Sequence, residues 1–182
     1  MKTTSHIWNN ETAFKLVEVF LKNPTKEMYE SEVRKMSGLS LGSANKYMKE
    51  IVKEDVVART KRGKMNFYRL NRDSQIVKQI KKTYSLSLDM VKELTAVAKN
   101  LSVKIYLFGS VARGEDTEDS DWDLLIISDK DINSVEPGIF RIKRKFGANL
   151  KYLMFKQSDW IKVSKNDPAF YERVEKDKIE LI

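Results

Sequence analysis

The chain has 182 residues, no cysteine and a formal net charge of +8. This length allows one or two domains with a well-buried core, and the lack of cysteine excludes a disulfide framework and a thiolate metal site. No apolar run approaches the length of a membrane span and no signal peptide is visible, so we expect a cytoplasmic protein with no membrane partner. The single His6 lies near the amino terminus, where we expect a solvated residue rather than a ligand.

The positive charge is confined to the first half of the chain. Residues 1–85 hold 18 Lys and Arg against 9 Asp and Glu, a balance of +9, whereas residues 86–182 hold 16 against 17, a balance of −1. Such an asymmetry is typical of a module that faces nucleic acid, joined to a module with another task.

The first module contains three helical patterns followed by a hairpin pattern. Apolar residues keep helical spacing over 11–22, 26–36 and 41–53, and Gly38 closes the second of these helices. Two β-rich runs then flank a basic turn between residues 56 and 70, which predicts a hairpin. The order resembles a winged helix-turn-helix DNA-binding domain, which we place at residues 1–72.

The resemblance implies that the third helix enters the major groove and that the hairpin, the wing, touches phosphates. A solvated surface with no partner is the alternative interpretation of these charges, and RNA binding is a weaker one because the wing pattern favours duplex DNA. The predicted DNA-binding residues are Ser43, Asn45, Lys46, Lys49, Arg59, Lys61, Arg62 and Lys64.

Residues 73–100 keep helical spacing and predict one long or broken linker helix that packs on the second domain. An apolar linker of this length could also pair with its twin in a homodimer. Packing within the monomer is the alternative.

The second domain, residues 101–182, begins with two buried strand patterns. The first ends in Gly109-Ser110, ten residues (111–120) follow, and Asp121-Trp122-Asp123 opens the second. A glycine at such a turn lets a ligand approach the backbone, and free N–H groups there can bind phosphate oxygens. Two aspartates that are two positions apart on a strand leave the same face, where a cation must offset their repulsion. An acidic surface loop at the end of a hairpin is the alternative interpretation.

This pattern resembles the DNA polymerase β-like nucleotidyltransferases, and most closely their minimal domains, whose turn often reads Gly-Ser-x-Ala-Arg-Gly, as residues 109–114 do. The resemblance implies that Gly109, Ser110 and Arg113 bind a nucleoside triphosphate such as ATP, and that Asp121 and Asp123 are catalytic and hold Mg²⁺ or Mn²⁺. Some minimal domains are antitoxins that adenylylate a partner toxin, so a protein acceptor is one candidate, beside a small molecule or an RNA end.

The rest of the domain predicts a helix over 131–146, a third strand over 149–155, a helix over about 158–176 and a short final strand. We therefore expect an α+β chain of two domains, with a small mixed sheet in the second. Complete family members carry a third carboxylate on the third strand, where this chain offers Asn149 and Lys151. The second metal ion is thus in question, and a catalytically silent, nucleotide-responsive transcriptional regulator is the alternative to an enzyme.

Overall fold

The computed structural model describes residues 10–181 and has a mixed α+β fold with two small sheets. His6 lies outside the described residues. The chain divides into two compact units, one ending at Gln79 and the other beginning at Ile80. Within residues 10–181, no helix has the length and apolar character needed to cross a membrane.

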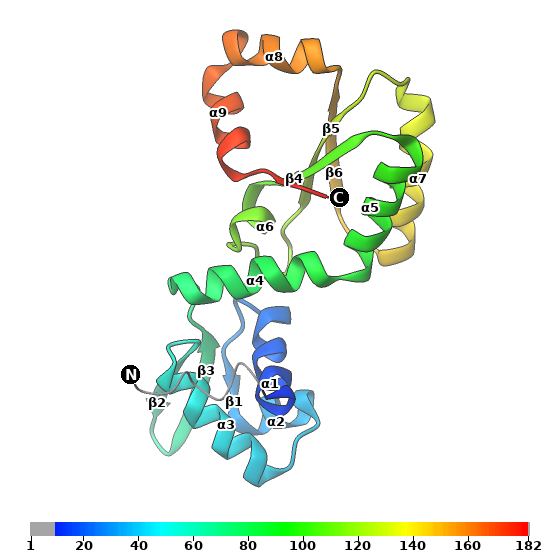
Figure 1. Cartoon of the computed structure of the whole chain (residues 1–182). Helices are drawn as coiled ribbons and strands as arrows, with labels where there is room; N and C mark the ends of the chain where they lie inside the picture. The colour runs from blue at the N-terminus through cyan, green and yellow to red at the C-terminus, as the bar shows by residue number, and fades with distance from the viewer. Residues whose placement is uncertain (1–9, 182) are drawn as a thin grey trace. The chain divides into compact units, whose positions relative to one another are not determined.

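The first unit consists of three helices and a three-stranded antiparallel sheet (Figure 1). Its elements are α1 (Glu11–Lys22), β1 (Met28–Tyr29), α2 (Glu30–Ser37), α3 (Leu41–Lys53), β2 (Val57–Arg62) and β3 (Met65–Leu70), and the strand order is β1-β3-β2. The side chain of Asn10 starts α1 by accepting a hydrogen bond from the N–H of Ala13 at 3.0 Å. The predicted hairpin is therefore present, as β2 and β3.

The second predicted helix begins later than expected. Met28 and Tyr29 form β1, which pairs with Tyr68 and Phe67 of β3, and Met28 is fully buried. The backbone N–H of Tyr29 donates to the carboxylate of Glu32 at 2.9 Å, which fixes the start of α2. Pairing with a strand about forty residues away outweighs the local helical spacing of this segment.

The second unit is built on a four-stranded mixed sheet with the order β6-β5-β4-β7. Strand β5 is antiparallel to β4 and parallel to β6, and β7 is antiparallel to β4, so the predicted small mixed sheet is confirmed. After α4 (Gln75–Ser87), which spans the boundary between the units, the elements are α5 (Asp89–Leu101), β4 (Lys104–Phe108), α6 (Gly109–Arg113), β5 (Trp122–Ile127), α7 (Ile132–Phe146), β6 (Leu150–Phe155), α8 (Gln157–Asn166), α9 (Pro168–Asp177) and β7 (Ile179–Glu180).

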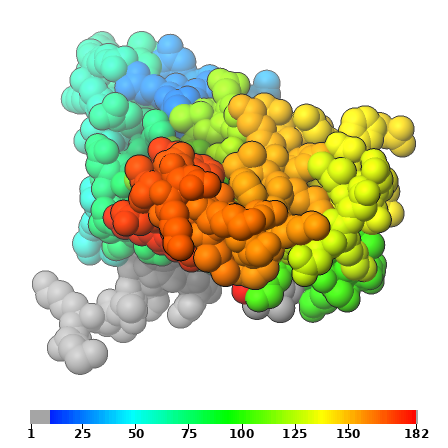
Figure 2. All heavy atoms as spheres, turned by 90° about the horizontal axis from the view of Figure 1, so that it is seen from above, coloured from blue at the N-terminus to red at the C-terminus, as the bar shows by residue number. Residues whose placement is uncertain are grey.

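Helices cover both faces of this sheet (Figure 1). Alternate strand residues, such as Ile105 and Leu124, pack with α5 and α7 in the larger apolar core. The residues between them, such as Tyr106 and Leu125, pack with Trp160 of α8 and with α9 in a smaller core. The outer sides of α8 and α9 form part of the surface seen in Figure 2 (orange to red). Because alternate residues point to opposite faces, Asp123 and Lys151 lie on the α8 and α9 side.

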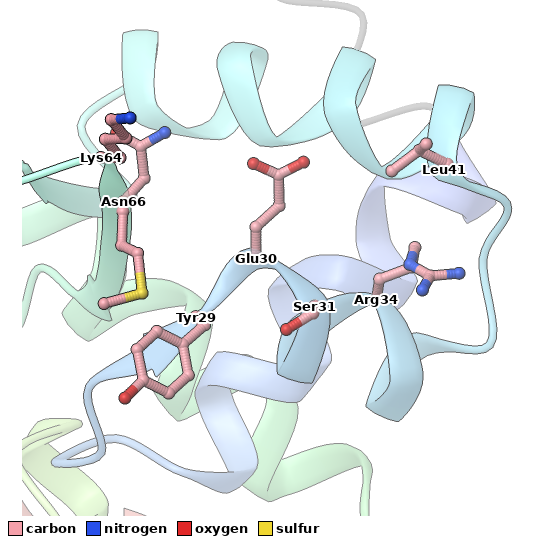
Figure 3. Close-up of a pocket in the computed structure, with 8 residues that line it drawn as sticks. Tyr29, Glu30, Ser31, Arg34, Leu41, Lys64 and Asn66 are labelled. Carbon is pink, nitrogen blue, oxygen red and sulfur yellow. The ribbon is translucent and has the colours of Figure 1, made fainter.

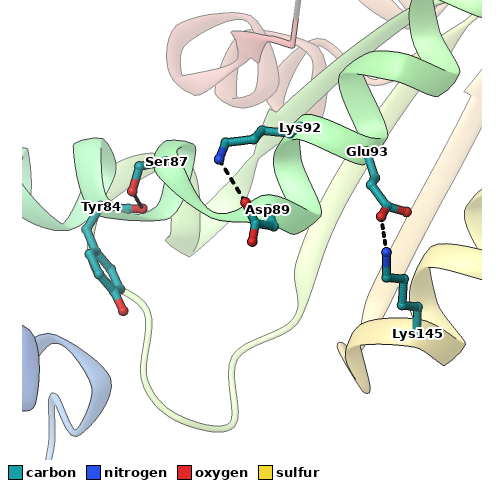
Figure 4. Close-up of polar contacts among 6 residues, drawn as sticks. All are labelled: Tyr84, Ser87, Asp89, Lys92, Glu93 and Lys145. Carbon is teal, nitrogen blue, oxygen red and sulfur yellow. Dashed lines mark hydrogen bonds and ion pairs between the residues drawn. The ribbon is translucent and has the colours of Figure 1, made fainter.

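The predicted linker helix is broken at Leu88, which precedes α5. Ser87 donates to the carbonyl of Tyr84 at 2.7 Å, and Lys92 pairs with Asp89 at 2.8 Å in the first turn of α5 (Figure 4). Lys145 at the end of α7 pairs with Glu93 (Figure 4). Apolar residues of α5, such as Val91 and Leu94, belong to the larger core, so the second half of the predicted linker is part of the second unit.

Candidate active site

The turn after β4 brings the backbone of Gly109 against the side chain of Asp123. Gly109 has φ +77°, and a β-carbon built on it would stand 2.4 Å from Oδ2 of Asp123. Only glycine combines this left-handed conformation with so close an approach. Helix α6 then runs for five residues to Arg113, and Gly114 caps its end. The predicted Gly-Ser turn therefore lies directly beside one of the two predicted aspartates.

The two aspartates lie at the start of β5. Asp123 is paired in register with Phe108, the last residue of β4, and Asp121 immediately precedes the strand. Burial, followed by repulsion from Asp121, raises the pKa of the Asp123 carboxyl above its ordinary value. Such a pair of carboxylates on one side of a sheet is unfavourable without a cation beside it.

Strand β6 supplies that cation in the form of Lys151. The Lys151 ammonium lies 2.5 Å from Oδ2 of Asp121, and the Asn149 amide donates to Oδ1 of the same carboxylate. The hydrogen bond to Asp121 raises the pKa of Lys151. The strand on which the family resemblance predicts a third carboxylate thus places a positive charge beside Asp121 instead.

Arg113, predicted to neutralise phosphate, is held by carboxylates. Its Nε lies 2.9 Å from Glu115, and its Nη1 lies 2.9 Å from Asp177 of α9. Both hydrogen bonds raise the pKa of the guanidinium. Burial keeps the pKa of Asp123 raised overall, and the positive charge of Arg113 offsets part of that rise. Ser110 is half-buried in α6, and its carbonyl accepts the N–H of Glu115 at 2.9 Å.

A cleft of about 530 Å³ opens beside Asp123. Phe108 and Phe170, whose rings meet edge to face at 6.4 Å, belong to its apolar part, and Asp123 and Lys151 supply its charged groups. Its lining residues are Phe108, Asp123, Leu124, Leu150, Lys151, Tyr152, Leu153 and Phe170. This volume lies in the range of small-molecule sites and combines charged groups with aromatic surface.

The loop between α6 and β5 is anchored by a buried ion pair that the sequence did not indicate. The ammonium of Lys81 lies 2.9 Å from Oδ2 of Asp116 and donates to its carbonyl at 2.7 Å. The Lys81 side chain is 3% exposed, and Oδ1 of Asp116 is buried without a hydrogen-bond partner. Lys81 precedes Asp116 by 35 positions, so no local pattern could have indicated the contact.

The residues predicted to bind DNA are not equally accessible. Lys46, Lys49, Arg59, Lys61 and Lys64 are exposed. Ser43 is half-buried, and its N–H donates to Ser40 at the start of α3. Asn45 is half-buried too, and its Oδ1 is buried without a partner. Arg62 is exposed but forms two hydrogen bonds with Glu27, at 2.6 and 3.0 Å.

A pocket of about 560 Å³ lies beside this surface in the first unit (Figure 3). Glu30 and Arg34 of α2, Leu41 at the start of α3 and Lys64 of the hairpin are among its lining residues. Of the residues predicted to bind DNA, Lys64 alone lines it. The carboxylate of Glu30 points into this space in Figure 3, which does not favour a phosphate there.

The glycine turn and the paired aspartates on a mixed sheet define a domain suited to bind phosphates and a metal ion. In a comparison with protein families, residues 90–182 match the family described as Polymerase beta, Nucleotidyltransferase, and the chain belongs to this family. A solved structure described as a candidate nucleotidyltransferase from Sulfolobus solfataricus matches over 57% of this chain and 85% of its own, at 20% identity and a TM-score of 0.32. A comparison with curated proteins finds no match.

Proteins of this family generally use a divalent metal ion and a nucleoside triphosphate, so the side chains must be tested against a cation. Within residues 10–181, no group of three or more His, Cys, Asp and Glu side chains could hold a metal ion. Asp121 and Asp123 offer the carboxylate oxygens that Mg²⁺ prefers, and substrate phosphates commonly complete such a site. The two aspartates therefore offer ligands for one divalent cation, and Oδ2 of Asp121 already pairs with Lys151.

Proposed function

We propose that the second unit transfers a nucleoside monophosphate from a nucleoside triphosphate, with ATP as the first candidate, to an acceptor hydroxyl. The close approach of Gly109 to Asp123 is the observation that supports this proposal most directly. It places the backbone at the start of α6, which the proposal assigns to the phosphates, directly beside one of the two proposed metal-binding aspartates. In the proposal, Gly109 and Ser110 bind the β- and γ-phosphates through backbone N–H groups, and Asp121 and Asp123 hold Mg²⁺ or Mn²⁺.

The protein contributes mainly by positioning and by electrostatics. A bound divalent cation would supply charge neutralisation for the triphosphate. The acceptor oxygen bonds to the α-phosphorus, the bond from that phosphorus to pyrophosphate breaks, and the hydroxyl proton passes to solvent. The cleft beside Asp123, with Phe108 and Phe170 in its wall, offers an apolar surface for a ring of either the nucleotide or the acceptor.

Labelled nucleotide provides the test. The full chain is incubated with α-labelled ATP, Mg²⁺ and cell lysate, and labelled products are separated before and after protease or nuclease treatment, which identifies the acceptor class. We expect a labelled product that both Asp121→Asn and Asp123→Asn lose. Asp129→Asn, an exposed position just after β5, is the matched control and should label normally. Unchanged labelling by both active-site variants would contradict the proposal.

A second candidate is a regulator that binds nucleotide without turnover. The pairing of Lys151 and Asn149 with Asp121 favours it, because both oxygens of one metal-binding carboxylate are already engaged. Calorimetry would then show Mg²⁺-dependent ATP binding, and no pyrophosphate would appear with any acceptor tried. Pyrophosphate release by the wild type that is lost in Asp121→Asn would favour the enzyme over the regulator.

For the first unit we propose a winged helix-turn-helix domain that binds duplex DNA. The order of α2, α3 and the β2–β3 hairpin supports it, as do the exposed charges of Lys46, Lys49, Lys61 and Lys64. A homodimer through the linker helix, a protein acceptor and a cytoplasmic location stay predictions.

A further inference from the structure

Both oxygens of the Asp121 carboxylate are engaged by residues of β6 or of the position just before it. Lys151 Nζ lies 2.5 Å from Oδ2, and Asn149 Nδ2 donates to Oδ1. Asp121 lies immediately before β5, where a cation shared with Asp123 would have to bind. An ion that binds there meets a carboxylate that already has partners.

The register of the sheet places Lys151 on the same face as the two carboxylates. Lys151 and Asp123 are paired in the parallel β5–β6 ladder, so their side chains leave the same face on neighbouring strands. The positive charge of Lys151 acts on Asp123 as well as on Asp121. Lys151 therefore brings a positive charge to the same face of the sheet on which the two aspartates would hold a divalent cation.

We propose that Lys151 is a resident counter-ion of this site and competes directly with a divalent cation for Asp121. The proposal rests on the metal site of the proposed function, but not on turnover. The Lys151 side chain is 63% exposed and carries its charge on a long flexible stem, so it can leave the carboxylate without rearranging the fold. Metal binding then requires that the ammonium move away.

A triphosphate changes this balance in favour of the metal. It supplies negative charge that attracts the divalent cation, and it gives the displaced ammonium a new anionic partner. Metal affinity should therefore be weak in the protein alone and rise when a non-hydrolysable ATP analogue is present. Reciprocity requires that the metal raise the affinity for the analogue by the same factor.

The test measures Mn²⁺ binding to the full chain by electron paramagnetic resonance, without nucleotide. We expect Lys151→Met to bind Mn²⁺ about two- to fivefold more tightly than the wild type, which is the range that release of an exposed ion pair allows. Lys151→Glu adds a carboxylate to the same face and should bind at least about tenfold more tightly. Lys156→Met removes the same charge just after β6, beside Asp159, and should leave the affinity unchanged.

Three outcomes would overturn the proposal. Equal affinities of wild type and Lys151→Met would show that the ammonium does not compete, and weaker binding by Lys151→Met would show that it organises the site instead. If Lys156→Met raised the Mn²⁺ affinity as much as Lys151→Met does, the loss of one positive charge anywhere on the protein would explain the effect.

The aspartate variants test the metal site separately. If Asp121→Asn and Asp123→Asn still abolish Mn²⁺ binding in any of these cases, the metal site and the proposed function stand. If neither aspartate variant affects binding, the metal site itself is wrong. Thermal unfolding of each variant verifies that it is folded.

Discussion

Gly109 and Asp123 lie so close together that no other residue fits at the glycine. A β-carbon on Gly109 would approach Oδ2 of Asp123 to 2.4 Å and Cγ to 3.3 Å, and the φ of +77° is itself unfavourable for a side chain. Two residues fourteen positions apart thus fix the geometry of the site through one contact. The contact therefore holds the turn after β4 against the Asp123 carboxylate.

Replacing Gly109 with alanine should therefore lower stability and abolish nucleotide binding. We expect the free energy of unfolding to fall by about 2–4 kcal/mol, because backbone strain and a clash act together. Gly147→Ala is the control, since Gly147 has φ +61° and a β-carbon added to it would meet nothing within 4 Å. It should cost about 1–2 kcal/mol, the strain alone. Equal losses in the two variants, measured by urea denaturation, would show that the contact with Asp123 is unimportant.

Removing one partner of the buried pair of Lys81 and Asp116 should strongly destabilise the loop before β5. Lys81→Met leaves the Asp116 carboxylate without its cation, and we expect a loss of about 3 kcal/mol or more. The double variant Lys81→Met, Asp116→Asn should recover part of that loss, because it removes the unpaired charge. Chemical denaturation of Lys81→Met, Asp116→Asn and the double variant gives the coupling between the two side chains. A double variant less stable than Lys81→Met would contradict this account.

Asp123 should reduce the stability of the metal-free protein at neutral pH. Its pKa is raised in the folded state, so the folded state takes up a proton more readily than the unfolded state, and the ionised group opposes folding. That cost is present above the folded pKa and disappears as the pH falls toward the ordinary value of 3.8. In the presence of a chelator, Asp123→Asn should raise the unfolding free energy at pH 7 by up to about 1 kcal/mol.

The gain should shrink as the pH is lowered toward 4, and Asp129→Asn should show none. The measurement is a series of denaturation curves from pH 7 downward. A loss of stability in Asp123→Asn at pH 7 would contradict the argument.

Arg113 should act mainly in the contact between α6 and α9. Arg113→Ala and Asp177→Asn should each lower stability, and a double-mutant cycle should give a coupling of about 1 kcal/mol for this partly exposed pair. Nucleotide affinity should change little in Arg113→Ala. A tenfold loss of affinity with unchanged stability would instead support the phosphate-binding role that the sequence suggests.

The sequence was sufficient where a signal is local. The glycine turn, the paired aspartates and the apolar runs of β4 and β5 each span only a few consecutive residues, and the structure brings the turn and Asp123 together. The sequence was insufficient where a partner far away in the chain determines the secondary structure or the pairing of a side chain. Met28 and Tyr29 follow helical spacing but pair with β3. Nothing in the sequence near Arg62 indicates its ion pair with Glu27, which lies 35 positions earlier. The Lys81–Asp116 pair belongs to the same class, because no periodicity links the two residues.

In the β2–β3 hairpin, Lys61, Arg62 and Lys64 carry equal charge but differ in their surroundings. Arg62 is tied to Glu27 by two hydrogen bonds and lies over the ring of Phe67 at 4.7 Å, whereas Lys61 and Lys64 are exposed. A paired guanidinium releases fewer counterions on binding DNA than a free ammonium does. In salt titrations of binding to duplex DNA, replacing Lys61 and Lys64 together with alanine should flatten the log–log slope by about two.

Arg62→Ala should leave the slope nearly unchanged and lower the stability of the first unit instead, since it removes an ion pair and a ring contact. Lys99→Ala combined with Lys104→Ala removes the same charge from exposed positions of the second unit and is the control. A slope that flattens equally in the control would assign the effect to net charge. If Arg62→Ala flattens the slope by one unit, the ion pair with Glu27 opens on DNA and Arg62 contacts phosphate. Absence of duplex binding at low salt by the folded wild type would contradict the DNA-binding proposal altogether.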